Sequence, residues 1–129
     1  MSVRIVRLGS PRLSDEGVRI GTVRRPPRGV PKSEYASGNW FDVWFPNLAP
    51  SEATRKLGMS ATTNAQWRGF VRKYLAEMRE PEHARAIALL AAFSHIASFS
   101  IGCYCEDESR CHRSVLRTLL AEQGADFAC

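Results

Sequence analysis

The 129-residue sequence contains no apolar run that approaches the roughly 20 residues needed to span a bilayer. Its first 17 residues interleave charged and apolar side chains, so they lack the continuous apolar core of a signal peptide. No internal repeat or low-complexity segment is visible. These absences predict one domain over residues 1–129, located in the cytoplasm and without a membrane-bound part.

Histidine and cysteine are scarce, with three and four residues in the chain. In a reducing cytoplasm so few cysteines do not build a disulfide scaffold, and clustered ones favour metal or redox chemistry. The sequence also lacks the two C-x2-4-C or H-x3-5-H pairs that a structural zinc site usually combines. A conventional zinc finger and a disulfide-rich secreted domain are therefore both excluded.

The composition is that of a folded soluble protein, with 44% hydrophobic and 24% charged residues. A formal net charge of +5 comes from an excess of arginine. This charge permits nucleic acid or small anions as partners. Because no long basic run and no ladder of aromatic residues is present, nucleic-acid binding is the weaker of these two predictions.

The order of the predicted elements indicates the fold class. Alternation of apolar and polar residues predicts strands that begin at Val3 and Val18, and an apolar run predicts a buried strand over 98–104. Ser51 and Asn64 are candidate helix caps, with Gly58 ending the first helix, and a further helix begins at Pro81. A last helix ends at Gly124, before a short strand over 125–129.

This order predicts an α/β domain with a small, mostly parallel sheet and flanking helices. Functional sites in such sheets lie beyond the carboxyl ends of the strands. Two segments with reactive side chains occupy such positions, the arginine-rich loop after the second strand and the cysteine-rich turn over 103–113. We therefore expect them to lie at the same edge of the sheet.

The cysteine-rich turn follows the buried strand directly. Because side chains alternate along a strand, Cys103 and Cys105 are predicted to share one face, with Tyr104 on the other. Cys111 falls in or near the first turn of the next helix, for which Asp107 or Ser109 is the predicted N-cap. A thiol at the N-terminus of a helix is stabilised as the thiolate.

Three uses of these cysteines are open at this stage. Cys103, Cys105 and Cys111 are candidate ligands of zinc or iron. The side chains of adjacent residues in a helix point about 100° apart, which makes it difficult for Cys111 and His112 to bind the same ion. Alternatively, Cys105 or Cys111 is a nucleophile or redox thiol, with His112 as acid–base group. The third possibility is that Cys103 and Cys111 are small buried hydrophobic residues.

The arginines suggest an anion site. Arg24, Arg28 and Arg113 are candidate ligands for a small anionic molecule, since guanidinium groups suit phosphate and carboxylate. Cys105 and Arg110 have the C-x4-R spacing of a phosphate-binding loop. However, the intervening residues 106–109 are mostly acidic and include no glycine, which argues against a phosphate cradle there.

The chain resembles the family of domain of unknown function 488, in particular its YeaO-like branch. The matching stretches are VRIGTVRRPPRGVPK, FDVWFPNLAPS, WRGFVRKYLAEM and IGCYCEDESRCHRSVLRTLL, in family order. The resemblance implies a compact α/β fold with a parallel-type sheet and no established activity. According to the resemblance, Arg24 and Arg28 match arginines that are common in the family. Val23 stands at a position where family members commonly carry an acidic residue. It also implies that cysteines in the last turn belong to the wider family more than to the YeaO-like branch.

Together these observations predict a pocket that binds a small anionic molecule beside the cysteine-rich turn. Whether the protein is an enzyme stays open. The alternatives are a metal-binding module and a nucleic-acid-binding domain.

Overall fold

A four-stranded parallel sheet organises the computed structural model, which describes residues 1–128. The strands are β1 (Val3–Arg7), β2 (Val18–Gly21), β3 (Val43–Trp44) and β4 (Phe99–Cys103). Their order in the sheet is β1-β4-β2-β3, and every pairing is parallel. Ile101 of β4 pairs with Ile5 on one side and Ile20 on the other. The predicted α/β class with a parallel sheet is confirmed.

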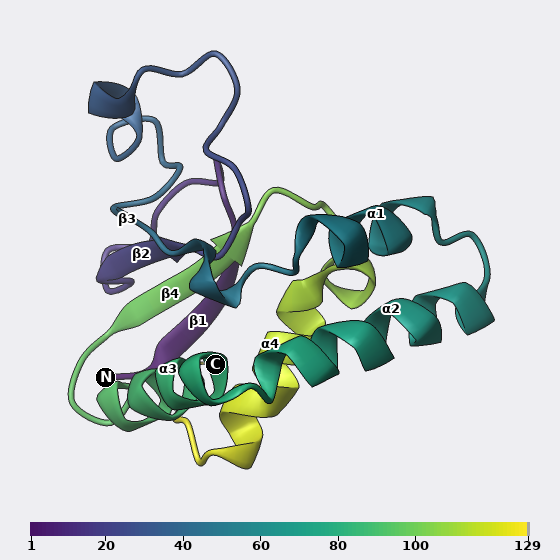
Figure 1. Ribbon diagram of the computed structural model, residues 1–129. Helices are drawn as coiled ribbons and strands as arrows, with labels where there is room; N and C mark the ends of the chain where they lie inside the picture. The colour runs from purple at the N-terminus through teal and green to yellow at the C-terminus, as the bar shows by residue number, and fades with distance from the viewer. Residues whose placement is uncertain (129) are drawn as a thin grey trace.

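The described chain also contains four α-helices and three short 3-10 helices (Figure 1). The α-helices are α1 (Glu52–Ser60), α2 (Asn64–Met78), α3 (Pro81–Phe93) and α4 (His112–Glu122). The 3-10 helices are η1 (Lys32–Glu34), η2 (Pro46–Leu48) and η3 (Glu108–Arg110). None of the described helices combines the length and the apolar character that crossing a bilayer requires.

The two faces of the sheet are covered differently. Helices α2, α3 and α4 lie on one face, where Phe99 and Ile101 join their apolar side chains in the main core. The other face is covered by the loops before β2 and before β3. There Arg19 is fully buried and donates hydrogen bonds to the carbonyl oxygens of Ser10 and Asn39, which holds both loops against the sheet.

Several predicted boundaries need correction. Helix α1 continues through Gly58 to Ser60. The glycine allows close contact between α1 and α2, because a Cβ atom there would lie 2.8 Å from the Phe70 ring. Thr63, not Asn64, caps α2, because the Thr63 side chain and Gln66 form a reciprocal capping box. The predicted strand over 125–129 is reduced to a single bridge between Phe127 and Val3, and Cys129 lies outside the described residues.

The cysteine-rich turn also differs from its predicted form. Asp107 caps the short η3 instead of the long helix. Cys111 is itself the N-cap of α4, with an extended backbone (φ −135°, ψ 152°). The separation of about 100° between neighbouring residues of a helix therefore does not apply to Cys111 and His112.

Candidate functional site

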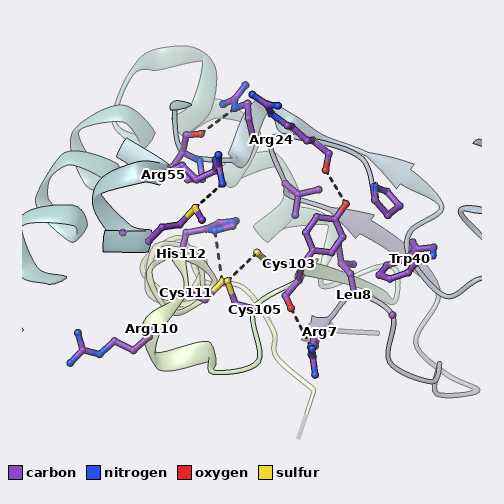
Figure 2. Close-up of a pocket in the computed structure, with 18 of the residues that line it drawn as sticks. Arg7, Leu8, Arg24, Trp40, Arg55, Cys103, Cys105, Arg110, Cys111 and His112 are labelled. Atoms are coloured by element: carbon purple, nitrogen blue, oxygen red, sulfur yellow. Dashed lines mark hydrogen bonds between the residues drawn. The ribbon is translucent and has the colours of Figure 1, made fainter. Parts of the chain in front are cut away.

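A cavity of about 1030 Å³ opens at the carboxyl ends of β1, β2 and β4 (Figure 2). We call it the edge pocket. Its lining comes from residues 7–11 after β1, 23–28 after β2, 103–105 after β4 and 110–112 at the start of α4, with side chains of α1 and α2 closing it. The two segments expected at one edge of the sheet are therefore together in one cavity.

Aromatic and proline side chains form much of the wall. Trp40 and Tyr104 meet edge to face with ring centroids 5.9 Å apart. The Tyr104 hydroxyl donates a hydrogen bond of 2.9 Å to the carbonyl oxygen of Arg25, which joins the β4 turn to the arginine loop. Trp67 and Phe70 contribute from α2. Such walls suit the organic part of a ligand.

Six arginines line the edge pocket: Arg7, Arg24, Arg25, Arg28, Arg55 and Arg110. Within residues 1–128, no aspartate or glutamate is among the lining residues. Glu52 lies nearby and pairs with Arg55, and it lies 3.8 Å from Arg25. The lining is consequently cationic and attracts anions.

The two loop arginines named from the sequence both line the edge pocket. Arg28 is exposed, and the described part of the chain offers it no hydrogen-bond or ion-pair partner. Arg24 donates hydrogen bonds of 3.1 Å from its Nε to Pro50 and from a terminal nitrogen to Ala49, both to carbonyl oxygens. Arg24 thus fixes the chain before α1, whereas Arg28 is free to meet a ligand.

Arg113 does not line the edge pocket. Its side chain is buried, with 3% of its surface exposed, and donates a hydrogen bond of 2.6 Å to the carbonyl oxygen of Cys105. Its Nε has no hydrogen-bond partner among the described residues. The structure therefore places Arg113 behind the cysteine-rich turn, where it holds the backbone of that turn.

Two of the three acidic residues of the turn, Asp107 and Glu108, are bound to partners in the turn and in α4. Asp107 accepts hydrogen bonds from the backbone and side chain of Ser109. Glu108 forms a two-bond ion pair with Arg117 of α4, at 2.7 and 2.9 Å. Asp107 and Glu108 are therefore used for local folding. Glu106 differs, because its carboxylate lies 3.6 Å from a guanidinium nitrogen of Arg7 and offsets part of the positive charge there.

The cysteines lie on the floor of the edge pocket (Figure 2). Cys103 and Cys111 are buried, whereas Cys105 is exposed, and all three are free thiols. The Sγ atoms of Cys103 and Cys105 are 3.8 Å apart, although β4 ends at Cys103 and Cys105 lies beyond the strand. The Sγ atoms of Cys103 and Cys111 and a ring nitrogen of His112 all lie within 4.8 Å of one another.

His112 is oriented by the backbone of β2. Its Nε2 lies 2.7 Å from the carbonyl oxygen of Thr22, which can only accept, so Nε2 carries the proton. In the neutral ring Nδ1 is then unprotonated, and it lies 3.8 Å from the Cys111 Sγ. The ring also meets Tyr74 edge to face, at 5.5 Å. His112 therefore directs a lone pair towards the cysteines.

The three thiols are close enough to shift one another's pKa. Hydrogen bonds from Cys103 and Cys105, with the neighbouring His112 ring, hold the pKa of Cys111 below its usual range despite burial. The hydrogen bond that Cys103 donates to Cys105 raises the pKa of Cys103. Negative charge in the cluster therefore concentrates on Cys111.

Sequence reasoning missed several lining residues. Arg7 ends β1, so the same carboxyl-end argument could have found it. Arg55 and Trp40 reach the edge pocket only through the path of α1 and of the loop before β3, which no local pattern specifies. Arg110 lies over the Trp67 ring, 5.6 Å from its centroid, a contact between segments more than 40 residues apart.

Comparison with known proteins gives the family. The model described as "Active DUF488-N3 subclade" matches residues 3–124. Neither the curated proteins nor the solved structures that were compared with the chain gave a match. Because the matched range covers nearly the whole domain, the chain belongs to the family of domain of unknown function 488.

Proposed function

We propose that the edge pocket binds a small molecule that carries a phosphate or carboxylate group. The observation that supports this is the lining: six arginines and, within residues 1–128, no carboxylate, at the carboxyl edge of a parallel sheet. Several guanidinium groups around one cavity favour a multiply charged group, so phosphate is the better candidate. The aromatic wall accommodates the uncharged part of the ligand.

The arginines have different roles in this proposal. Arg28 binds the anion directly, because its guanidinium is exposed and unpaired among the described residues. Arg24 keeps part of its hydrogen-bonding capacity for the ligand while it anchors Ala49 and Pro50. Arg113 supports the turn from behind and is a positioning residue.

Calorimetric titration with inorganic pyrophosphate and with a nucleoside monophosphate tests the proposal. Loss of a charge-assisted hydrogen bond costs about 1.5–3 kcal/mol, so Arg28→Ala should weaken binding about tenfold or more. Arg85→Ala is the matched control, because Arg85 is an exposed arginine of α3 that does not line the edge pocket. Equal weakening in both variants would show that only the net charge matters.

A short single-stranded oligonucleotide separates the two sources of phosphate. If the ligand is a nucleic acid, the oligonucleotide binds more tightly than the mononucleotide, with an affinity that falls steeply as salt increases. If the ligand is a small molecule, the mononucleotide or pyrophosphate binds at least as well. Absence of binding by all three probes at low salt would remove the proposal.

Thiol-dependent chemistry is the second candidate, favoured by the position of Cys111 at the N-terminus of α4 beside His112 Nδ1. Nδ1 accepts the thiol proton, and the Cys111 thiolate is then the nucleophile; Cys105, the exposed thiol, is the alternative nucleophile or redox thiol.

Alkylation of the native protein with iodoacetamide tests this candidate, with the modified residues identified by mass spectrometry. Rapid modification of Cys111 or Cys105, faster than that of a small free thiol, supports it. If both remain unmodified in the metal-free folded protein, thiol-dependent chemistry is excluded.

A further inference from the structure

We propose that the floor of the edge pocket is a tetrahedral Zn²⁺ site with four ligands: Cys103, Cys105, Cys111 and His112. This inference does not depend on the anion-binding proposal, because the metal ligands and the arginines are different residues. It assigns His112 to the metal, and it therefore goes beyond a site made of three cysteines. It is an alternative to the thiol-dependent candidate, because a His112 Nδ1 that binds Zn²⁺ cannot accept the proton of Cys111.

The distances between the donor atoms fit such an ion. With Zn–S bonds of about 2.3 Å and Zn–N bonds of about 2.0 Å, tetrahedral geometry sets S···S near 3.8 Å and S···N near 3.6 Å. The Sγ atoms of Cys103 and Cys105 are 3.8 Å apart. The Cys111 Sγ and the His112 Nδ1 are also 3.8 Å apart. Cys103, Cys111 and His112 already converge within 4.8 Å of one another. Cys105 lies outside this three-residue group and reaches it through Cys103, so the Cys105 side chain has to shift to complete the tetrahedron.

The two elements that deliver these ligands are held rigidly. Cys103 ends β4, the central strand next to both β1 and β2. Cys111 precedes the first residue of α4 with an extended backbone, which turns its side chain back beside His112. This geometry is the reason why neighbours in the sequence can share one ion.

The environment of His112 is that of a metal-binding histidine. Such a residue usually donates its second ring N–H to a backbone carbonyl or carboxylate, which fixes the ring and the tautomer. Here Nε2 donates to the Thr22 carbonyl oxygen at 2.7 Å. The remaining nitrogen, on a side chain that is only 7% exposed, faces sulfur. Cysteines that serve only as packing residues do not require this arrangement.

Arg113 provides an independent electrostatic argument. Its guanidinium is buried, yet no carboxylate of residues 1–128 forms an ion pair with it, and its Nε has no partner. A buried charge without a counter-charge is costly. Three thiolates, one Zn²⁺ and one neutral imidazole carry a net charge of −1 next to the Cys105 carbonyl that Arg113 binds. The metal site thus supplies the missing counter-charge.

Zinc is favoured over other cations by the ligand types. Thiolate and imidazole ligands in a tetrahedral arrangement select Zn²⁺, whereas Mg²⁺ and Ca²⁺ require oxygen ligands. Because Cys105 is the exposed member of the set and lines the edge pocket, it is the ligand nearest to a bound molecule.

Elemental analysis of the untagged protein, purified without chelator and then equilibrated with Zn²⁺, should give one zinc per chain. Titration with Co²⁺ of the metal-free protein should saturate at one equivalent, with tetrahedral d–d bands and thiolate-to-cobalt charge transfer. Zinc well below one equivalent, or cobalt without these bands, would overturn the proposal. An iron content above that of zinc would overturn the choice of metal.

His112→Gln tests the new ligand. It should weaken Zn²⁺ binding about 100-fold or more, since loss of a supporting residue alone costs 10–100-fold. His95→Gln is the matched control and should bind zinc like the unaltered chain, because His95 contacts the Gly124 carbonyl oxygen and lies outside the cluster. Equal affinity of His112→Gln and His95→Gln would refute the role of His112. If His112→Gln does not fold, the cobalt spectrum of the unaltered protein decides the proposal alone.

Discussion

Replacing Glu16 with glutamine tests the buried ion pair that holds one wall of the edge pocket. Arg19 donates to Glu16 at 2.7 Å from Nε and at 2.9 Å from a terminal nitrogen, and the Ser100 hydroxyl donates to the same carboxylate at 2.7 Å. Both charged side chains are essentially inaccessible to solvent. The pair fixes Arg19, which in turn holds the loop that carries Ser10 and Pro11 of the edge pocket.

The size of the effect follows from the pKa of Glu16. Burial raises this pKa, but the hydrogen bonds from Arg19 and Ser100 lower it further, from 4.5 to about 2. Because the folded-state pKa is depressed, the stabilisation is present above pH 4.5 and is lost as the pH falls towards 2. A difference of about 2.5 pKa units corresponds to about 3 kcal/mol, of which about 2 kcal/mol is lost by pH 3.

Urea unfolding followed by tryptophan fluorescence, from pH 7 to pH 3 and in the presence of a chelator, measures this contribution. At pH 7 Glu16→Gln should lose about 3–5 kcal/mol, because Arg19 is left buried without its partner. Between pH 6 and pH 3 the variant should lose about 2 kcal/mol less than the unaltered chain. Glu122→Gln, at the exposed end of α4, is the control and should follow the unaltered chain. Parallel pH profiles for Glu16→Gln and the unaltered chain would refute the reasoning.

Three further substitutions test the packing by the same unfolding assay. Gly21→Ala should destabilise the protein by about 1–3 kcal/mol, since the new Cβ would clash with the buried Phe41 ring. An unchanged free energy of unfolding would contradict the close contact between Gly21 and Phe41. Gly69→Ala, in the middle of α2 with its nearest neighbour atom at 3.9 Å, should stabilise by about 0.5–1 kcal/mol, and a loss of stability would show hidden crowding. Thr63→Ala should cost about 1 kcal/mol because it removes the capping box of α2, whereas a neutral result would mean that water replaces the cap.

The sequence predicts the fold class well because the strong signals are local. The apolar run predicted as a strand over 98–104 is β4 (Phe99–Cys103), so Tyr104 and Cys105 lie beyond its end. The order of elements then favours a parallel sheet whose carboxyl ends meet at one edge. Strand β3 has only two residues, and no periodicity can indicate so short an element.

The geometry of the site is less accessible from the sequence. The convergence of Cys111 and His112 depends on the extended backbone of Cys111, and that depends on η3 ending just before it. The orientation of the acidic turn depends on the ion pair between Glu108 and Arg117, two residues nine apart. Helical periodicity places Cys111 in or near the first helical turn, so it does not predict that Cys111 and His112 lie side by side, as the proposed zinc site requires.

Amide chemical-shift mapping during a pyrophosphate titration tests the anion-binding proposal most directly. With the ¹⁵N-labelled chain, the shifted amides should cluster in residues 24–28, 103–105 and 110–112, which line the edge pocket. Arg85, the exposed arginine of α3, should stay unaffected. Shifts spread over all arginine-bearing surfaces, or concentrated outside the residues that line the edge pocket, would contradict the assignment of the edge pocket as the anion-binding site.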